Sequence, residues 1–388
     1  MRVQLLALTI ARLFLNTGLR MVYPFIPALA RGLGVEITAV YRLVTFRNFA
    51  GLLSPVFGPL SERYGRKPII IIATLLFALG CLIVVVWPAY WGLGATLIVI
   101  GIAKVIFDPA MQAYIGDTVP YQQRGRALAL TETSWAGGLL VGAPAIGFAI
   151  QTWGWRAPFV WLGGLAIGAA LLLWRTLPRI PHAAHRLLTL RDTARTIRQH
   201  PVIWAAALYT LLAMCANEIF FIVYGDWMEA SFALSLASLG LASGIIGGAE
   251  ISGEVMAGFL VDRFGKRPVI ITAGLLNAAA YFIIPYTAVS LSAALVTLVV
   301  LSIFFEITLV GGVPLLTELV PGARSVVMAV ALAAGALGRA IGSLAGPLIW
   351  EYAGFRGSSV AATAVMFLGI LVLARWVKEF SPASLPAD

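Results

Sequence analysis

Twelve Asp, Glu, Lys and Arg side chains of this 388-residue chain lie inside long apolar stretches, more than two residues from either end, where an uncompensated charge is unfavourable. At the centre of a lipid bilayer such a charge costs about 2.5–3.5 kcal/mol even on a lenient scale. Residues of this kind bind charged ligands, carry protons or pair with one another. They are Arg12, Arg20, Arg42, Arg47, Lys104, Asp108, Glu132, Glu218, Glu250, Glu254, Glu306 and Arg339.

The acidic members of this set are candidates for carrying protons, because burial favours a neutral carboxyl and access to water favours a carboxylate. The sequence predicts proton coupling through Glu218, Glu250, Glu306, Asp108 and Glu132. Glu250 lies one helical turn before Glu254, and two like charges at this spacing predict a raised pKa for at least one of them unless a cation or Arg339 lies between them. Lys104 and Asp108 have the same spacing and opposite charge, so an alternative for this pair is mutual neutralisation.

The basic members predict where a substrate binds, and the candidates are Arg20, Arg47, Lys104 and Arg339. The first half of the chain holds five of these bases against two acids, and the second half holds one base against four acids. We therefore expect an anion-accepting wall in the first half and proton handling in the second. The alternative is that acids and bases pair as structural contacts. Arg12, Arg42 and Glu254 lie nearer the ends of their stretches, and we expect them to reach the lipid headgroups.

The stretches that hold these residues are predicted to be membrane spans. Hydrophobic residues make up 60% of the chain and charged residues only 11%, compared with about 25% charged in soluble domains. A span needs about 20 mostly apolar residues. Twelve such stretches are predicted, at 4–30, 37–60, 68–87, 91–116, 127–152, 157–174, 201–228, 235–261, 268–288, 290–319, 325–350 and 357–376. The first follows Arg2 without a small-residue cleavage site, so we expect it to be retained.

The net charge of +10 indicates membrane orientation rather than nucleic-acid binding. With both termini placed in the cytoplasm, the cytoplasmic loops and tails, counted with Arg375 at the end of the last stretch, hold 18 of the 27 Lys and Arg residues, and the opposite face holds three. Cytoplasmic loops of membrane proteins carry such an excess of basic residues. The sequence therefore predicts a multi-pass protein of the cell (inner) membrane, surrounded by lipid and without a nucleic-acid partner.

The longest polar segment, 177–200, is predicted to be a cytoplasmic linker, and an amphipathic helix on anionic headgroups is one form for it. It contains all three histidines of the chain, but their scatter among arginines does not predict a metal site. Cys81 and Cys215 lie in apolar stretches and predict packing rather than a disulfide or a cluster. No metal or cofactor is expected.

A sequence repeat flanks this linker. The segment 58–68 (GPLSERYGRKP) recurs 200 residues later as 258–268 (GFLVDRFGKRP). Shorter matches at the same offset, within one residue, relate 119–124 to 320–324 and 154–156 to 354–356. Two related six-helix halves are the simplest account of these matches.

The repeated segment resembles the signature loop of the major facilitator superfamily, often called motif A. The resemblance covers the whole chain and implies an all-α membrane protein, with twelve transmembrane helices in two pseudo-symmetric six-helix bundles. The bundles would be 1–176 and 201–388, joined by the linker 177–200. In this family the loop latches one conformation through ion pairs between helix ends. Transferred residue by residue, the resemblance implies gating by Gly58, Glu62, Arg63, Gly65, Arg66, Asp117, Gly258, Asp262 and Arg263. Glu62 stands where the family usually has Asp.

The stretch 127–152 resembles a second motif of the same family, often called motif C, which is found in proton-coupled exporters. Its members here are Gly138, Gly142, Pro144 and Gly147. Small residues four positions apart let helices approach closely, and proline bends a helix. Ala143 stands where the motif usually has Gly. The arginine of a third motif, motif B, is missing from 97–104, so the proton relay of the drug exporters is not transferred.

Together these observations favour a monomeric secondary transporter that works by alternating access. We expect it to export a small amphipathic or organic-ion substrate in exchange for protons. The alternatives are a carrier or flippase for an anionic or zwitterionic lipid-like amphiphile, and a metabolite importer. An enzyme is not expected, because no histidine lies in a predicted span and neither buried cysteine has a nearby base. A G-x-x-x-x-G-K-[ST] motif for ATP is absent from the sequence.

Overall fold

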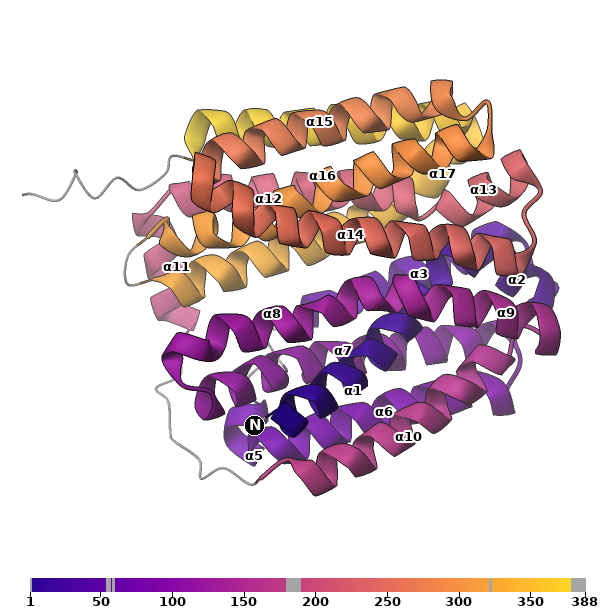
Figure 1. Cartoon of the computed structure of the whole chain (residues 1–388), viewed down its shortest axis with the longest axis horizontal. Helices are drawn as coiled ribbons and strands as arrows, with labels where there is room; N and C mark the ends of the chain where they lie inside the picture. The colour runs from indigo at the N-terminus through magenta and orange to yellow at the C-terminus, as the bar shows by residue number, and fades with distance from the viewer. Residues whose placement is uncertain (1, 54–56, 58–59, 179–189, 321–322, 378–388) are drawn as a thin grey trace, which may run out of the picture. The chain divides into compact units, whose positions relative to one another are not determined.

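The computed structural model describes residues 2–53, 57, 60–178, 190–320 and 323–377 (Figure 1). Within these residues all regular secondary structure is helical. Nine helices of this described part are long and apolar enough to cross a membrane, and one bent pair of helices makes a tenth. The prediction of an all-α membrane protein is confirmed.

The helices form two compact units. Unit 1 comprises Met1–Leu187 and Val223–Gly248, and unit 2 comprises Leu188–Ile222 and Ala249–Asp388. The predicted bundle boundary at the linker assigns 223–248 to the second bundle, whereas the closest packing of this segment is with first-half helices. The division into two related six-helix bundles, which the sequence repeat suggested, stays a prediction.

Unit 1 is built around a first span that is broken in two. Its helices are α1 (Arg2–Arg20), α2 (Val22–Leu33), α3 (Ile37–Ala50), α5 (Leu60–Tyr64), α6 (Arg66–Val86), α7 (Tyr90–Thr118), α8 (Tyr121–Gly137), α9 (Ala143–Trp153), α10 (Ala157–Thr176), α13 (Tyr224–Phe232) and the start of α14 (Leu236–Phe264), with the short η1 (Gly51–Leu53) and η2 (Gly138–Gly142). The predicted span 4–30 bends by 55° between α1 and α2. Pro24 explains the break, because it offers no N–H to the carbonyl of Arg20 four residues earlier.

Unit 2 contains the helices of the second half and the end of the linker. They are α11 (Leu190–Gln199), α12 (Val202–Phe221), the rest of α14, α15 (Lys266–Thr287), α16 (Leu291–Glu318) and α17 (Arg324–Trp376). As a straight helix, the 53 residues of α17 would be about 80 Å long, more than twice the thickness of the hydrocarbon core. The chain reverses at Gly354, where φ is 62° and ψ −162°. α17 therefore accounts for the two predicted spans 325–350 and 357–376.

The two copies of the repeated loop share one tight turn. Gly65 between α5 and α6 has φ 93°, and Gly265 between α14 and α15 has φ 84°. A residue with a Cβ is strained at such positive φ values, so glycine is required at both turns. The repeat seen in the sequence is thus a repeat of backbone conformation.

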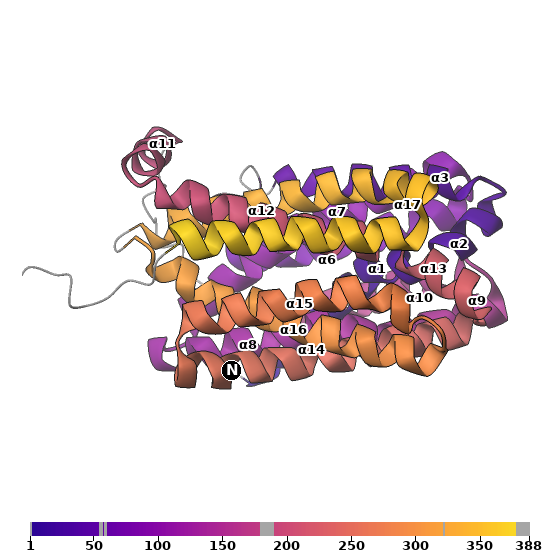
Figure 2. The same cartoon turned by 90° about the horizontal axis from the view of Figure 1, so that it is seen from above.

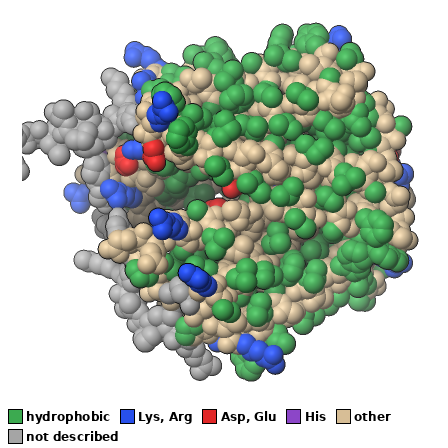
Figure 3. All heavy atoms as spheres, viewed as in Figure 1, with side chains coloured by type: hydrophobic (Ala, Val, Ile, Leu, Met, Phe, Trp, Pro, Cys, Tyr) green, Lys and Arg blue, Asp and Glu red, His purple; other side chains and the backbone are tan. Residues whose placement is uncertain are grey.

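Small and apolar residues fill the contacts between helices inside each unit. In unit 1, α6 packs along α7, and α1 packs against α8 and α10. In unit 2, α12 packs along α17 and α15 along α16. Hydrophobic side chains are also spread widely over the visible surface, while Lys and Arg lie near the edges of the view (Figure 3). This outward apolar surface is what lipid contact requires.

Candidate functional site

Arg12 is the centre of a buried ion-pair cluster in unit 1. Its Nε lies 3.1 Å from Asp108 Oδ1 on α7, and its Nη1 lies 2.8 Å from Glu132 Oε2 on α8. Nη1 also donates a hydrogen bond to the carbonyl oxygen of Thr131 at 3.0 Å. The expectation that Arg12 reaches the headgroups is wrong, because these partners hold its guanidinium inside the unit.

Lys104 is the second base of the cluster. Its Nζ lies 2.7 and 2.5 Å from the two carboxylate oxygens of Asp108, one turn further along α7. Two bases therefore face two acids. The sequence predicted substrate binding by Lys104 and proton coupling by Asp108 and Glu132. The structure brings these three residues together around Arg12, for which neither role was predicted.

The acids of this cluster are more exposed than its bases. The exposed fraction of the side chain is 27% for Asp108 and 44% for Glu132, but only 5% for Arg12 and 10% for Lys104. The two acids are therefore the members of the cluster that solvent or a ligand reaches most easily, and a carboxylate attracts cations. The sequence had favoured an anion-accepting wall in this half.

The face of α1 that carries Arg12 continues to contact α8 over the next two turns. Asn16 Nδ2 donates to Ser134 Oγ at 3.1 Å. Arg20 Nη1 donates to the carbonyl oxygen of Trp135 at 3.0 Å, and its guanidinium carbon lies 4.4 Å from the centre of the indole ring. Arg20 is buried, and its cation–π contact helps to hold α1 on α8.

Arg47 on α3 holds the break in the first span. Its Nη1 donates to the carbonyl oxygen of Leu19 at 2.7 Å, and its Nη2 donates to the hydroxyl of Tyr23 at 2.9 Å. Carbonyls in the last turn of a helix lack partners within that helix, so Arg47 acts as a cap for α1. Substrate binding by Arg20 and Arg47 stays a prediction, and both guanidinium groups contribute to the packing of unit 1.

The predicted residues of unit 2 lie at two close helix contacts. Glu218 on α12, Glu250 on α14 and Glu306 on α16 are buried. A Cβ built on Gly253 of α14 would lie 2.8 Å from Glu306 Cβ. Glu250 lies one turn before Gly253, on the same face of α14. Glu250 and Glu306 therefore belong to one contact between α14 and α16.

The second contact in unit 2 joins α12 to α17. A Cβ built on Gly342 would lie 2.7 Å from Glu218 Cβ. Arg339, which the sequence predicted to bind substrate, lies one turn before Gly342 on the same face of α17. Glu218 and Arg339 are thus placed near the same contact between α12 and α17.

The first copy of motif A forms an ion pair with the end of α7. Arg66 Nε lies 3.1 Å from Asp117 Oδ2, and Arg66 Nη1 donates to Ser61 Oγ at 2.8 Å. Glu62 is partly buried and Arg63 is exposed. Gly58 lies outside the described residues. The gating role of this loop stays a prediction.

The second copy of the loop repeats the ion pair. Lys266 pairs with Glu318 at the end of α16, so Arg66 and Asp117 have counterparts at offsets of 200 and 201. Asp262 and Arg263 are exposed. A Cβ built on Gly258 would meet open space, so close packing does not require glycine at that position.

Lys67 and Arg267, at matching positions of the two loop copies, each cap the end of a helix, and no role was predicted for them. Lys67 Nζ donates to the carbonyl oxygen of Trp174 at 2.6 Å and to that of Leu177 at the end of α10. In unit 2, Arg267 donates to the carbonyl oxygens at 374 and 377 at the end of α17, at 2.5 and 3.0 Å. A cation at the C-terminal end stabilises a helix, because it interacts favourably with the helix dipole and binds the last carbonyl groups, which have no partner within the helix. The repeated spacing of 107 and 110 residues could have revealed the pair.

Motif C forms the join between α8 and α9, where η2 is a π-helix. A widened turn of this kind is common at functional sites. A Cβ built on Gly142 would lie 2.5 Å from Thr17 Oγ1, and one on Gly138 would lie 3.2 Å from the Asn16 backbone. These two glycines therefore let α1 approach the π-helix closely.

The other two residues of motif C face the first part of α14. A Cβ built on Gly244 would lie 2.9 Å from Pro144 Cγ, and one on Gly147 would lie 3.2 Å from Gly240 Cα. Gln151 Oε1, one turn beyond Gly147, accepts a hydrogen bond from the backbone N–H of Ala237 at 3.0 Å. Motif C thus packs α9 onto the segment 223–248 of unit 1.

Two polar contacts fasten α13 to α2 and α3 at the end of unit 1 opposite Arg66. Arg31 Nη1 lies 2.6 Å from Glu229 Oε1, and its Nη2 lies 3.3 Å from Oε2. Tyr41 donates a hydrogen bond to Asp226 Oδ2 at 3.3 Å. The sequence had singled out none of these residues for a role, because the partners lie 198 and 185 positions apart.

Neighbouring glycines on α14 give a matched test of this packing. A Cβ at Gly247 would lie 2.7 Å from the carbonyl oxygen of Ala136 and 2.9 Å from Leu140 Cα, whereas a Cβ at Gly248 would meet only Leu140 Cδ1, at 3.8 Å. We expect Gly247→Ala to lower the free energy of unfolding by about 2 kcal/mol through overpacking. Gly248→Ala should leave it unchanged or raise it by up to about 1 kcal/mol. Thermal unfolding of both variants in detergent measures the difference, and equal midpoints would contradict the close approach.

Comparison with protein families gives one match that extends over the chain in two parts. The family is described as Major Facilitator Superfamily, and its model matches residues 8–225 and 206–387. The two matched parts correspond to the two copies of the sequence repeat. The family that motif A suggested is the family that matches.

The curated relatives are identical to this chain at about a quarter of the aligned positions. The uncharacterized MFS-type transporter YwfA of Bacillus subtilis (strain 168) is 24% identical over 396 residues, covering 99% of this chain and 94% of the relative. Multidrug resistance protein 2 of the same organism is 25% identical over 273 residues, 65% of each chain. Tetracycline resistance protein, class C, of Escherichia coli is 25% identical over 292 residues, 69% of this chain and 70% of the relative.

Solved structures are similar over nearly the whole chain. The D-xylose-proton symporter has a TM-score of 0.80 at 20% identity and covers 97% of both chains. A bacterial homolog to the human lysosomal transporter Spinster has a TM-score of 0.81 at 17% identity, covering 97% of this chain and 98% of that chain. These likenesses show the fold.

Proposed function

The chain belongs to the Major Facilitator Superfamily, and from this premise we propose that it exports amphipathic organic cations in exchange for protons. It would work by alternating access as a secondary transporter. Multidrug and tetracycline resistance proteins among the relatives support export. Motif C, which packs α9 onto α14, also favours export through its resemblance to exporters.

The observation that carries this proposal is the arrangement of the Arg12 cluster. Asp108 and Glu132 are its more exposed members, and the side chains of the two bases are nearly buried. A substrate cation that approaches the cluster meets carboxylate oxygens. The carboxylate of Glu132 can pair with that cation or take up a proton, and each event weakens the other. Such competition for one group is the simplest way to couple exchange.

The buried carboxyls of unit 2 support the proton part of the proposal. Glu218, Glu250 and Glu306 lie at close helix contacts away from solvent. In a transport cycle that opened these contacts alternately to the two sides of the membrane, the three carboxyl groups would meet water from each side in turn. They would then be placed to take up and release protons.

A carrier for anionic or zwitterionic amphiphiles is the alternative that the sequence left open. It would need Arg20 and Arg47 to face the substrate. Both are buried, and they donate hydrogen bonds to the carbonyl oxygens of Trp135 and Leu19. These contacts support a structural use of the two arginines, and the anion carrier is therefore the weaker candidate.

The proposed orientation of this transporter in the membrane follows from the distribution of its basic residues. The loops that carry Arg66 and Lys266 would face the cytoplasm, together with both termini. The transporter would act as a monomer in the cell (inner) membrane. The contacts of Arg31 and Tyr41 with α13 would then lie on the outer side.

Transport by the purified protein in liposomes with an imposed pH gradient tests the proposal. The probes are a cationic dye and an anionic dye of similar size. We expect the gradient to drive the cationic dye. Glu132→Gln should reduce that transport at least about tenfold, because the amide cannot take up a proton and loses an ionic contact with the cation worth about 1.5–3 kcal/mol. The matched control is Glu36→Gln, which removes an exposed acid from the same unit.

Three outcomes would count against separate parts of the proposal. An unchanged rate for Glu132→Gln would remove the role of the cluster. Faster transport of the anionic dye by the unaltered protein would contradict the substrate class. Full transport after an ionophore has collapsed the pH gradient would contradict proton coupling.

A further inference from the structure

The helix at the end of the linker lies across the direction of the spans of unit 2. Figure 2 shows α11 end-on, whereas α12, α15 and α16 run across the view. In Figure 1, where the same spans also run horizontally, α11 lies at their end. A helix perpendicular to the spans at their end lies parallel to the membrane surface.

The inner side of α11 is fixed to the hydrophobic core of unit 2. Ile197 packs against a buried cluster made of Ile203, Ala206, Leu316, Val320, Val327 and Ala331. Ala323 and Met328, at the start of α17, pack against the same cluster. Through this cluster α11 is packed together with α12, the end of α16 and the beginning of α17.

Two exposed tryptophans mark the depth of the membrane surface beside α11. Trp204 lies in the first turn of α12 and is 62% exposed, and Trp376 at the end of α17 is 59% exposed. Exposed tryptophans of membrane proteins sit at the level of the headgroups. α11 ends at Gln199, five residues before Trp204, and lies beyond the end of the spans. Its depth is therefore that of the headgroup layer.

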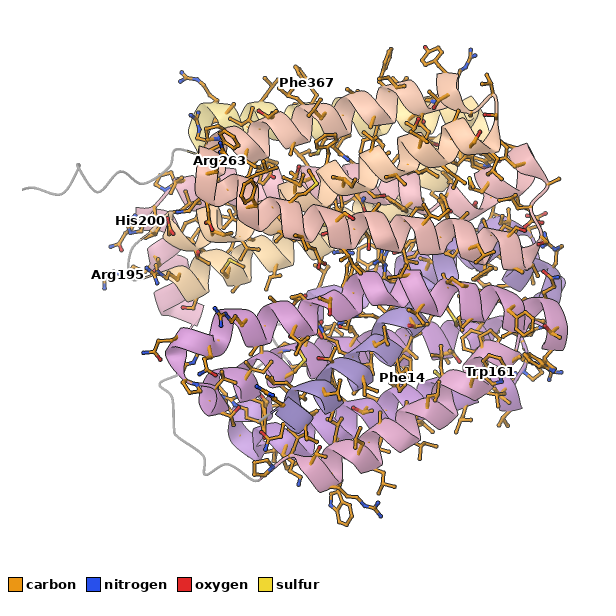
Figure 4. All side chains as sticks on the ribbon, viewed as in Figure 1. Phe14, Trp161, Arg195, His200, Arg263 and Phe367 are labelled. Atoms are coloured by element: carbon orange, nitrogen blue, oxygen red, sulfur yellow. The ribbon has the colours of Figure 1, made fainter. Side chains whose placement is uncertain are left out.

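The outer side of α11 is basic. Arg195 and Arg198 are exposed, as is His200 directly after the helix. Arg324, the first residue of α17, is exposed next to Ala323 of the Ile197 cluster. Figure 4 shows Arg195 and His200 projecting at the same end of unit 2 as Arg263. Each Lys or Arg close to an anionic membrane surface adds about 1 kcal/mol of attraction.

We propose that α11 binds the headgroups of anionic phospholipids through Arg195, Arg198 and Arg324, and that this contact fixes the start of α17. The interaction goes beyond the proposed transport function and does not depend on the substrate. The ligand is a phosphate-bearing headgroup held in the plane of the membrane. An acidic soluble protein would lack that plane, and the position of α11 beside Trp204 favours the lipid.

The direct test measures lipid bound to the full-length protein in detergent by native mass spectrometry. Phosphatidylglycerol is compared with phosphatidylcholine at equal concentration. We expect phosphatidylglycerol to be retained, and the double variant R195Q/R198Q to bind it about tenfold more weakly. The matched control is Arg356→Gln, which removes an exposed arginine from the opposite end of unit 2. An equal loss of binding in this control would overturn the assignment to α11.

A second measurement uses the unaltered protein and so does not depend on the folding of a variant. Phosphatidylglycerol should raise the midpoint of thermal unfolding, and the increase should shrink as NaCl rises from 50 to 500 mM, because salt screens exposed charges. Inorganic phosphate at the same concentration should not reproduce it. An increase that phosphatidylcholine or free phosphate matches would overturn the proposal. Binding is read without transport, so failure of the proposed export leaves this test intact.

Discussion

Arg12→Gln is expected to lower the free energy of unfolding by about 3 kcal/mol, the largest stability effect of any single side chain in unit 1. Removing one partner from a buried ion pair leaves the other charge uncompensated. Here the loss affects Asp108 and Glu132 together, because Arg12 contacts both carboxylates and the Thr131 carbonyl. The measurement is the midpoint of thermal unfolding in detergent, followed by the fluorescence of the purified protein.

Two further variants separate charge balance from loss of bulk at Arg12. Arg42→Gln removes an exposed arginine from α3 and should leave the midpoint unchanged. The double variant R12Q/E132Q removes one base and one acid, and it retains the pair of Lys104 with Asp108. It should be more stable than Arg12→Gln alone, since charge balance is restored. If the double variant were the less stable of the two, the ion-pair account would be wrong.

The parts of the fold that depend on neighbouring residues could be predicted from the sequence. Stretches of about 20 apolar residues predict spans, since the thickness of the bilayer sets their length. The turn at Gly65 and its copy at Gly265 followed from the repeated motif, because only glycine adopts that conformation without strain. The reversal at Gly354 is likewise the counterpart of Gly154, which the repeat had already matched.

The parts that depend on distant partners could not be predicted from the sequence. Position along a span indicates the depth of Arg12 but not its direction, and the two carboxylates it contacts lie 96 and 120 residues away. Depth alone suggested lipid headgroups. In the same way, Arg47 was recognised as an intramembrane charge, but its partner at Leu19 arises from the break in the first span. The bend frees the carbonyl that Arg47 caps.

The internal repeat separates the shared framework from what is particular to each unit. At the helix ends, Lys67 and Arg267 cap carbonyls at matching positions, and Arg66 and Lys266 form matching ion pairs. Inside the spans the match fails. Leu212 stands 200 residues after Arg12, and the residues 200 positions before Glu218, Glu250 and Glu306 are Gly18, Ala50 and Ile106. The contacts at the helix ends therefore belong to the shared framework, whereas the charges inside the spans are particular to each unit.

Neutralising the buried carboxyls of unit 2 is expected to uncouple transport from the pH gradient. Glutamine has nearly the shape of a protonated glutamate, so Glu306→Gln and Glu250→Gln should preserve the contact between α14 and α16. The amide cannot release a proton, however. Accumulation of the cationic dye driven by a pH gradient should fall about tenfold or more, to the level seen without a gradient. Exchange of labelled for unlabelled dye at equal pH should remain within about twofold of the unaltered protein.

This contrast between accumulation and exchange distinguishes a proton carrier from a residue that only supports the fold. A structural defect would reduce both measurements together, because a misplaced α14 or α16 impairs every step of the cycle. Glu351→Gln is the matched control, since Glu351 is an exposed acid of the same unit, and it should retain both activities. Glu218→Gln extends the test to the contact between α12 and α17. If all three buried variants kept accumulation driven by the pH gradient, unit 2 would not handle the proton, and Asp108 and Glu132 would be left as the acids that couple transport.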